Sequence, residues 1–483
     1  MAEGSLKNTT VKGVGWSFTD SILNQGITFL VGVVLARLLT PEEYGLLGIL
    51  MIFIIISESI VNSGLSNALI RKQDASETDF NTVFVTNLVL SFVMYGVLFL
   101  GAPLISLFFK RPELTILLRV IGIVVIFNAL SLVPNTKLAK KVDFKTVTYC
   151  SFAASVISGI VGIGMALKGY GVWALVGQQI SKQFVLSLAF WIAEKWLPKI
   201  QFSIQSFKEL WNFGWKLLVS GLINTIWNEI YKLVIGRCYD PQTLGQYTQA
   251  HTYSDLFSRN MSNVIQRVSY PVLSKMQDEK ERMKQAYRLV IKVTMLVTFV
   301  FMFGLAGCAK SFIYVLIGEQ WLPCVGYLQI LCFSMALYPL HAINLNMLQV
   351  QGRSDLFLKL EIIKKCIAVV PLLLGIFVGI YWMLGCSVVT GWISYYLNAY
   401  YSGPYLKYSA WDQIRDLIPS MFLSLGMGAI VWLVGLLPLS PYALLPIQIA
   451  VGAVIVFAVC EWSKLEEYVQ IKEIALNIIK RKK

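Results

Sequence analysis

Apolar stretches of roughly 18 to 25 residues, the length that crosses a bilayer, recur along the whole chain and are separated by short polar segments. There are fourteen, and they begin near residues 14, 44, 81, 115, 147, 171, 212, 245, 286, 324, 357, 383, 415 and 441. Because fourteen spans of about 20 residues occupy about 280 positions, the loops leave no room for a folded extramembrane domain. The pattern predicts an all-α polytopic membrane protein.

The polar segment after the first stretch contains a helix start. In "LLTPEEYGLLG", Leu38 to Gly48, Thr40 is a suitable N-cap, Pro41 suits the first turn, and Glu43 stands three residues after Thr40 as in a capping box. We therefore expect the second membrane helix to begin at this point.

This helix start is repeated two hundred positions later. In "YDPQTLGQY", Asp240 and Pro241 supply the same cap and proline, and Gly245 corresponds to Gly45. The sequences before the two motifs also align, with Gly15-Trp16 on Gly214-Trp215 and Ser21 on Ser220. We therefore expect two six-helix repeats in parallel orientation, near 1–200 and 205–402, an arrangement typical of transporters with a cavity between the repeats. We predict an N-lobe at 1–203 (helices one to six), a C-lobe at 204–404 (helices seven to twelve), and two further helices with a basic, amphipathic cytoplasmic tail at 405–483.

Lysine and arginine are unevenly divided between the loops. The clusters at residues 137–145, 275–288 and 353–365 and the terminal "KRKK" all fall on the side that carries both tails. By the positive-inside rule that side is the cytoplasm, so we expect both termini of this multi-pass protein to be cytoplasmic. The net charge of +14 then reflects topology and anionic lipid headgroups rather than nucleic-acid binding.

Composition limits the chemistry further. The chain is 56% hydrophobic and 14% charged, with a mean hydropathy of +0.65, and it has two histidines. Its eight cysteines are scattered, without a Cys-x-x-Cys pair, and are interpreted as small buried residues. We expect no catalytic residue, no metal site and no cofactor.

Helix eight is the most polar of the fourteen. At 100° per residue, His251, Asp255 and Arg259 fall on one arc with Thr248, Thr252, Ser258, Ser262, Asn263 and Gln266, and Arg267 lies just beyond its edge. In a membrane such a face must turn towards water or other polar groups.

Two neighbouring helices add to this set. Helix seven has a stripe at four-residue spacing, formed by Lys216, Ser220, Asn224, Asn228 and Lys232. Glu229 stands three residues before Lys232 and is placed to pair with it. Helix six has Lys182 at mid-span among amide side chains. We expect these residues and those of helix eight to line a hydrated cationic cavity.

Other interpretations of the same residues stand beside this one. His251, Asp255 and Arg259 are spaced four apart and can satisfy one another inside the bundle. Lys216, Lys232, Arg267 and Lys292 can extend along the helix to lipid headgroups.

The fourteen helices in a six-six-two arrangement, together with "LARLLTPEEYGLLGI", resemble the polysaccharide transporter (lipid-linked oligosaccharide flippase) family. That family belongs to the MOP exporter superfamily, with the lipid II flippase and the MATE drug exporters. The resemblance covers nearly the whole chain. It implies a V-shaped, alternating-access fold that moves a polyprenyl-pyrophosphate-linked oligosaccharide to the outer leaflet of a bacterial inner membrane.

The resemblance also gives the predicted residues roles. Lysine and arginine would neutralise the pyrophosphate, and amides and hydroxyls would bind the sugars. Asp20 in helix one and Glu58 in helix two are candidates for coupling to a proton or sodium gradient or to the membrane potential. The Asp20 position is similar to one used in some MATE exporters. The implied partners are the lipid-linked glycan, membrane lipids and other polysaccharide-assembly membrane proteins.

Two other functions remain open. A MATE-like exporter of small cationic molecules would share the fold, but a basic cavity repels such cargo. A membrane glycan polymerase or ligase would need an external catalytic region, and every predicted external loop is short.

Overall fold

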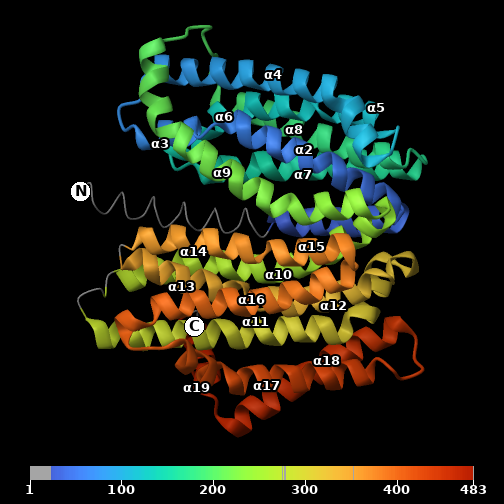
Figure 1. Cartoon of the computed structure of the whole chain (residues 1–483), viewed down its shortest axis with the longest axis vertical. Coiled ribbons are helices and arrows are strands. Elements are labelled where there is room, and N and C mark those ends of the chain that lie inside the picture. The colour runs from blue at the N-terminus through green and yellow to red at the C-terminus, as the bar shows by residue number, and fades with distance from the viewer. Residues whose placement is uncertain (1–22, 275, 277–278, 352, 482–483) are drawn as a thin grey trace. The chain divides into compact units, whose positions relative to one another are not determined.

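The computed structural model describes residues 23–481, apart from 275, 277, 278 and 352. Every secondary-structure element in this described part of the chain is a helix (Figure 1). The predicted all-α class is therefore confirmed. The chain forms two compact units, Met1–Gly245 and Gln246–Lys483.

The first unit begins with a helical segment, Leu23–Leu38. Its other helices are α2 (Pro41–Asn62), α3 (Leu65–Arg71), α4 (Glu77–Phe109), α5 (Leu114–Ile121), α6 (Ile123–Lys140), α7 (Phe144–Leu167), α8 (Val172–Glu194) and α9 (Ile204–Cys238). Helix α8 packs on α6 and α7, and α9 packs along α2, α3 and α4.

Helix α10 (Pro241–Ser274) starts in the first unit and continues into the second. The second unit further contains α11 (Lys280–Ile317), α12 (Cys324–Met335), α13 (Tyr338–Val350), α14 (Ser354–Ile367), α15 (Val369–Phe377), α16 (Ile380–Ser402), α17 (Ala410–Val434), α18 (Pro441–Ser463) and α19 (Glu466–Arg481). Two short 3₁₀ turns lie at Glu319–Trp321 and Pro404–Leu406. The domain boundaries at 203/204 and 404/405 follow the sequence repeat and stay a prediction.

The predicted spans agree well with these helices. A helix begins within eight residues of the predicted start of every span from the second to the fourteenth. Within the described residues, eight helices are long and apolar enough to cross a membrane. Helices α8, α9 and α10, which contain the predicted cavity residues, are not among the eight, as expected for helices that carry polar groups within a bundle.

Helix α4 shows which surface meets lipid. Leu100, Leu104 and Leu107 are 77%, 71% and 76% exposed, whereas Asn87 and Ser91 are completely buried. Apolar side chains therefore point outward and small polar ones inward, as in a bundle surrounded by hydrocarbon. The unit has the surface of a membrane protein.

Both helix starts predicted from the sequence are formed. The Thr40 N–H donates to Glu43 Oε2 (2.7 Å) and the Glu43 N–H donates to Thr40 Oγ1, which completes the capping box. At the second copy, the Thr243 N–H donates to Asp240 Oδ1 at 2.6 Å. Both predicted helix starts are thus confirmed.

The two copies of the motif also touch. A Cβ on Gly45 would lie 1.7 Å from the Pro241 carbonyl oxygen, and a Cβ on Gly245 would lie 1.8 Å from the Pro41 carbonyl oxygen. The starts of α2 and α10 therefore meet backbone to backbone, each glycine against the proline of the other copy. Only a residue without a side chain permits this approach.

In the second unit, a buried hydrogen-bond cluster joins four helices. The Asn344 amide oxygen of α13 accepts from the Tyr287 hydroxyl of α11 (2.9 Å), the Ser402 hydroxyl of α16 (2.7 Å) and the Gln413 amide of α17 (3.2 Å). Asn344, Ser402 and Gln413 are fully buried. Because unpaired polar groups are costly in this environment, the cluster fixes α17 to the bundle of the second unit.

We predict that Gly45→Ala destabilises the protein by about 1–3 kcal/mol, the usual cost of forcing extra volume into a packed interior. The measurement is the unfolding free energy, or the thermal midpoint, of the detergent-solubilised protein. Gly164→Ala is the matched control, because a Cβ there meets nothing within 4 Å. Equal stability of Gly45→Ala and the unmodified protein would show that the motifs do not pack in this way.

Candidate functional site

Lys182 lies in the middle of α8 and is half-buried. The part of α8 that follows it is held to α6, since the Gln183 amide donates to Ser131 Oγ (3.3 Å) and the Trp191 indole donates to the Leu130 carbonyl (2.9 Å). Across the described residues, no hydrogen bond or ion pair to the Lys182 ammonium is formed. A cation at this depth needs water or an anionic ligand beside it.

The predicted polar stripe is present on α9. Lys216, Ser220, Asn224 and Asn228 are all exposed. The helix is fastened to α2 by a hydrogen bond from Thr225 Oγ1 to Ser59 Oγ (3.4 Å). The stripe therefore lies on a fixed helix of the first unit, the same unit that contains Lys182.

The end of the stripe differs from its start. Lys232 Nζ lies 2.8 Å from Glu229 Oε2, and their side chains are 20% and 12% exposed. This is the pair expected from the three-residue spacing, so the pairing prediction is confirmed. Lys232 is neutralised within the protein, whereas Lys216 has no ion-pair partner in the described part of the chain.

The structure describes only one of the two acidic coupling candidates, Glu58. Glu58 lies on α2, partly buried, and it forms no ion pair with any described residue. Asp20 lies outside the described residues.

Three of the predicted residues of helix eight lie on α10 in the second unit. Asp255 Oδ1 is 3.0 Å from Arg259 Nε, with side chains 23% and 46% exposed. The His251 ring lies against Tyr247, with the ring centroids 5.8 Å apart. Asp255 and Arg259 thus satisfy each other, as the alternative interpretation expects, while the exposed side of Arg259 stays open to solvent.

The polar arc predicted for this helix is too broad. Ser258 and Ser262 are buried, and the Ser258 hydroxyl donates to the Met335 carbonyl of α12 at 2.6 Å. A serine hydroxyl can contact a neighbouring helix as readily as it can face water. The helical periodicity of the sequence does not distinguish these two environments. The Arg267, Asn263 and Gln266 side chains lie outside the described residues.

Lys292 does not need headgroups to be neutralised. Its ammonium lies 2.7 Å from Glu466 Oε2 and 3.5 Å from Glu467 Oε2, both on α19. Glu467 is almost fully buried and also accepts from the Ser420 hydroxyl. These contacts anchor the start of the tail helix to α11 and α17.

Sequence reasoning also missed a buried cation. Lys137 was counted only as part of a cytoplasmic cluster, yet its side chain is 9% exposed and its ammonium lies 2.7 Å from Glu77 Oε1. The ammonium also lies over the rings of Phe80 and Trp196, 4.8 and 4.7 Å from their centroids. No local spacing links these residues, because the contact joins distant parts of the sequence.

We predict that Lys232→Ala lowers the unfolding free energy by about 1–3 kcal/mol, because it leaves the Glu229 carboxylate without its partner. The double variant Lys232→Ala/Glu229→Gln should recover part of this loss. Lys216→Ala, on the same helix, should change stability by less than about 0.5 kcal/mol. Chemical unfolding in detergent measures all three, and a loss that Glu229→Gln fails to relieve would contradict the pairing.

Comparison with known proteins agrees with this architecture. The model of a family described as "Polysaccharide biosynthesis protein" matches residues 34–326, more than half of the chain. The succinoglycan biosynthesis transport protein ExoT of Rhizobium meliloti (strain 1021) is 26% identical, over 65% of this chain and 63% of its own length. The match thus spans less than two thirds of that relative. The lipopolysaccharide biosynthesis protein WzxC of Escherichia coli (strain K12) is 22% identical, over 77% of this chain and 76% of its own length.

Solved structures show the fold. The lipid II flippase MurJ in an inward closed conformation has a TM-score of 0.75 at 15% identity, covering 94% of this chain and 99% of MurJ. An inward-facing multidrug resistance MATE family transporter of the MOP superfamily has a TM-score of 0.61 at 17% identity, covering 80% of this chain and 98% of the transporter. These family and fold neighbours are transporters and flippases rather than enzymes. The chain therefore belongs to the polysaccharide biosynthesis protein family and has the fold of the MOP superfamily, as its resemblance to that family predicts.

Proposed function

We propose that this protein is a flippase. It moves a polyprenyl-pyrophosphate-linked oligosaccharide from the cytoplasmic to the outer leaflet of a bacterial inner membrane, for the synthesis of a surface polysaccharide. The headgroup crosses by alternating access through a hydrated cationic cavity, and both termini face the cytoplasm. Family membership and the MurJ-like fold support this class of cargo.

One observation carries the proposal. Lys182 is half-buried near the middle of α8, which the sequence predicts to be a membrane helix, and it lacks any partner among the described residues. Placing a lysine at the centre of a membrane helix costs roughly 2.5–3.5 kcal/mol, whereas Lys232 and Lys137 are neutralised by carboxylates. An unpaired lysine at the middle of a membrane helix is explained if the cargo supplies its anionic partner.

A pyrophosphate headgroup fits this chemistry. It is multiply charged and cannot enter hydrocarbon unaided, and ammonium or guanidinium groups form strong charge-assisted hydrogen bonds with it. Lys182, Lys216 and Arg259 are proposed to contact the pyrophosphate, with Lys232, His251, Asp255 and Arg267 in supporting positions. Asn224 and Asn228 supply amides for sugar hydroxyls. No covalent bond changes, so the protein needs no catalytic group.

The names of the relatives agree with such cargo. They describe biosynthesis or transport of succinoglycan, teichuronic acid and lipopolysaccharide. The three names thus refer to three different glycans. We therefore assign the pyrophosphate carrier, rather than one particular sugar, as the feature the site recognises.

For the driving force, we propose Glu58 and Asp20 as coupling residues. A carboxylate in a membrane helix without an ion-pair partner is suited to bind a proton or a sodium ion. Glu58 meets this description within the described residues. The cycle would then draw on the ion gradient.

Deleting the gene should cause the carrier-linked glycan to accumulate in the cytoplasmic leaflet. Restoring it with Lys182→Ala should reduce surface glycan formation by about ten- to a hundredfold, the equivalent of one lost charge-assisted contact of about 1.5–3 kcal/mol. Lys182→Arg should retain most of the activity, and Lys208→Ala, an exposed lysine of α9, is the matched control. The readouts are leaflet-resolved carrier analysis and surface glycan, at equal protein abundance.

If Lys182→Ala, Arg259→Ala and Arg267→Ala all transport normally, the proposal that these residues line the cavity is wrong.

A deletion that alters drug tolerance and leaves surface glycan intact would instead indicate a MATE-like exporter. Glu58→Gln should make transport independent of the proton or sodium gradient, and unchanged dependence would exclude Glu58 from coupling.

A further inference from the structure

The segment that joins the two predicted repeats, residues 195–203, is bound along its length to the first turns of α4. The Trp196 indole donates to Glu77 Oε2 (2.8 Å), the Lys199 N–H donates to Asn81 Oδ1 (3.0 Å), and the Ser203 N–H donates to Thr82 Oγ1 (3.1 Å). Asn81 and Thr82 are buried. A linker between two lobes that move in an alternating-access cycle is expected to make few contacts. This linker is instead bound to α4 at three points.

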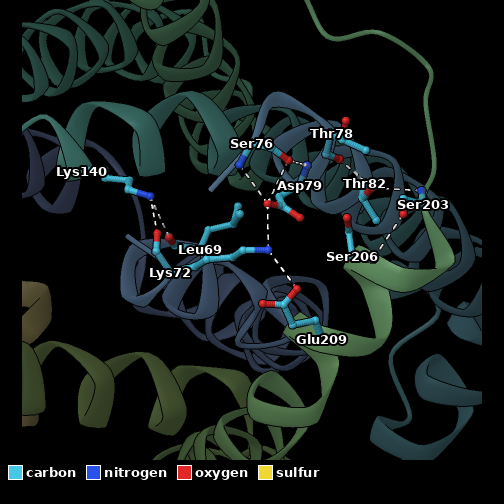
Figure 2. A network of polar contacts seen from close by, with 10 residues as sticks. All are labelled: Leu69, Lys72, Ser76, Thr78, Asp79, Thr82, Lys140, Ser203, Ser206 and Glu209. Atoms are coloured by element: carbon cyan, nitrogen blue, oxygen red, sulfur yellow. Dashed lines mark hydrogen bonds and ion pairs between the residues drawn. The ribbon is translucent and has the colours of Figure 1, made fainter. Parts of the chain in front are cut away.

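An ion-pair cluster continues the attachment onto α9. Figure 2 shows Lys72 between two carboxylates, with its ammonium 3.1 Å from Asp79 Oδ2 of α4 and 2.9 Å from Glu209 Oε2 of α9. Asp79 is 2% exposed and also caps α4 together with Ser76. The hydrogen bond to Glu209 raises the pKa of Lys72, so the lysine stays charged at neutral pH. Removing Lys72 would leave the Asp79 charge buried without its cation.

Apolar packing lies directly beneath these contacts. Trp196 of the linker and Leu210 of α9 share one buried cluster with Leu69, Phe80 and Val133. Figure 2 also shows Lys140, at the end of α6, donating to the backbone carbonyls of Leu69 and Lys72. These bonds tie the end of α6 to the end of α3. Opening the attachment would expose this cluster and several buried polar groups at once. These contacts favour an attachment that stays closed over one that opens and closes.

We propose that Lys72, Asp79 and Glu209 are positioning residues that hold the first turns of α9 on α3 and α4, and that this clasp stays closed throughout transport. Glu209 lies about two helical turns before Lys216, so the clasp sets the place and rotation of the polar stripe on α9. The link to transport rests on the proposed function, and the attachment itself does not.

The first experiment tests whether the clasp remains closed. Lys72→Cys/Glu209→Cys is joined with a short bis-maleimide in reconstituted protein in which the exposed Cys238 and Cys366 are replaced by serine. We expect the cross-linked protein to transport the carrier-linked glycan within about twofold of the protein that keeps Lys72 and Glu209 in the same serine background. Loss of transport on cross-linking would overturn the proposal, because it would mean that the clasp has to open.

The second experiment tests positioning without any cargo. Asn224→Cys on the stripe is labelled with a charged, water-soluble thiol reagent, with and without Lys72→Ala. We expect Lys72→Ala to change the labelling rate by about three- to tenfold, as for the loss of a partly buried ion pair, and the control Lys208→Ala to leave it unchanged. Lys72→Arg, which keeps a cation between Asp79 and Glu209, should retain the original labelling rate, whereas a role in folding alone would leave the labelling rate of the folded Lys72→Ala protein unchanged.

The two arms separate the two proposals. Unchanged labelling in folded Lys72→Ala protein would overturn the positioning role whatever the cargo is. If the deletion strain has a normal carrier-linked glycan, the proposed function fails, and the labelling arm still decides whether the clasp positions α9.

Discussion

A positive charge within a hydrocarbon layer requires either a carboxylate or water next to it, and five lysines of the predicted membrane helices and their ends fall into two groups. Lys137, Lys232 and Lys292 are each held by glutamates. Lys182 and Lys216 have no such partner in the part of the chain that the structure describes. The first group stabilises the protein, and the second is the one we propose to bind the cargo. The proposed function depends on this division more than on any motif.

Features with a local cause were predictable from the sequence. The start of α2 follows from Thr40 and Glu43, and the Glu229–Lys232 pair follows from helical spacing. The positions of the membrane helices follow from hydropathy, because the bilayer imposes a minimum apolar length on each one. Family membership could be inferred from the same pattern together with one loop.

Features with a non-local cause were not predictable. Lys72 and Glu209 are 137 positions apart in the chain, and nothing in either neighbourhood indicates the other. The use of Ser258 in packing depends on where the Met335 carbonyl lies. Helical periodicity identifies a polar face, but it does not say whether water or a neighbouring helix satisfies that face.

The reciprocal contact between the two Pro-x-x-x-Gly motifs has an evolutionary consequence. Gly45 packs on the Pro241 backbone as Gly245 packs on that of Pro41, so neither glycine can mutate without disturbing the other copy. Because each glycine faces the proline of the other motif, we expect selection to preserve both glycines while the sequence around them drifts.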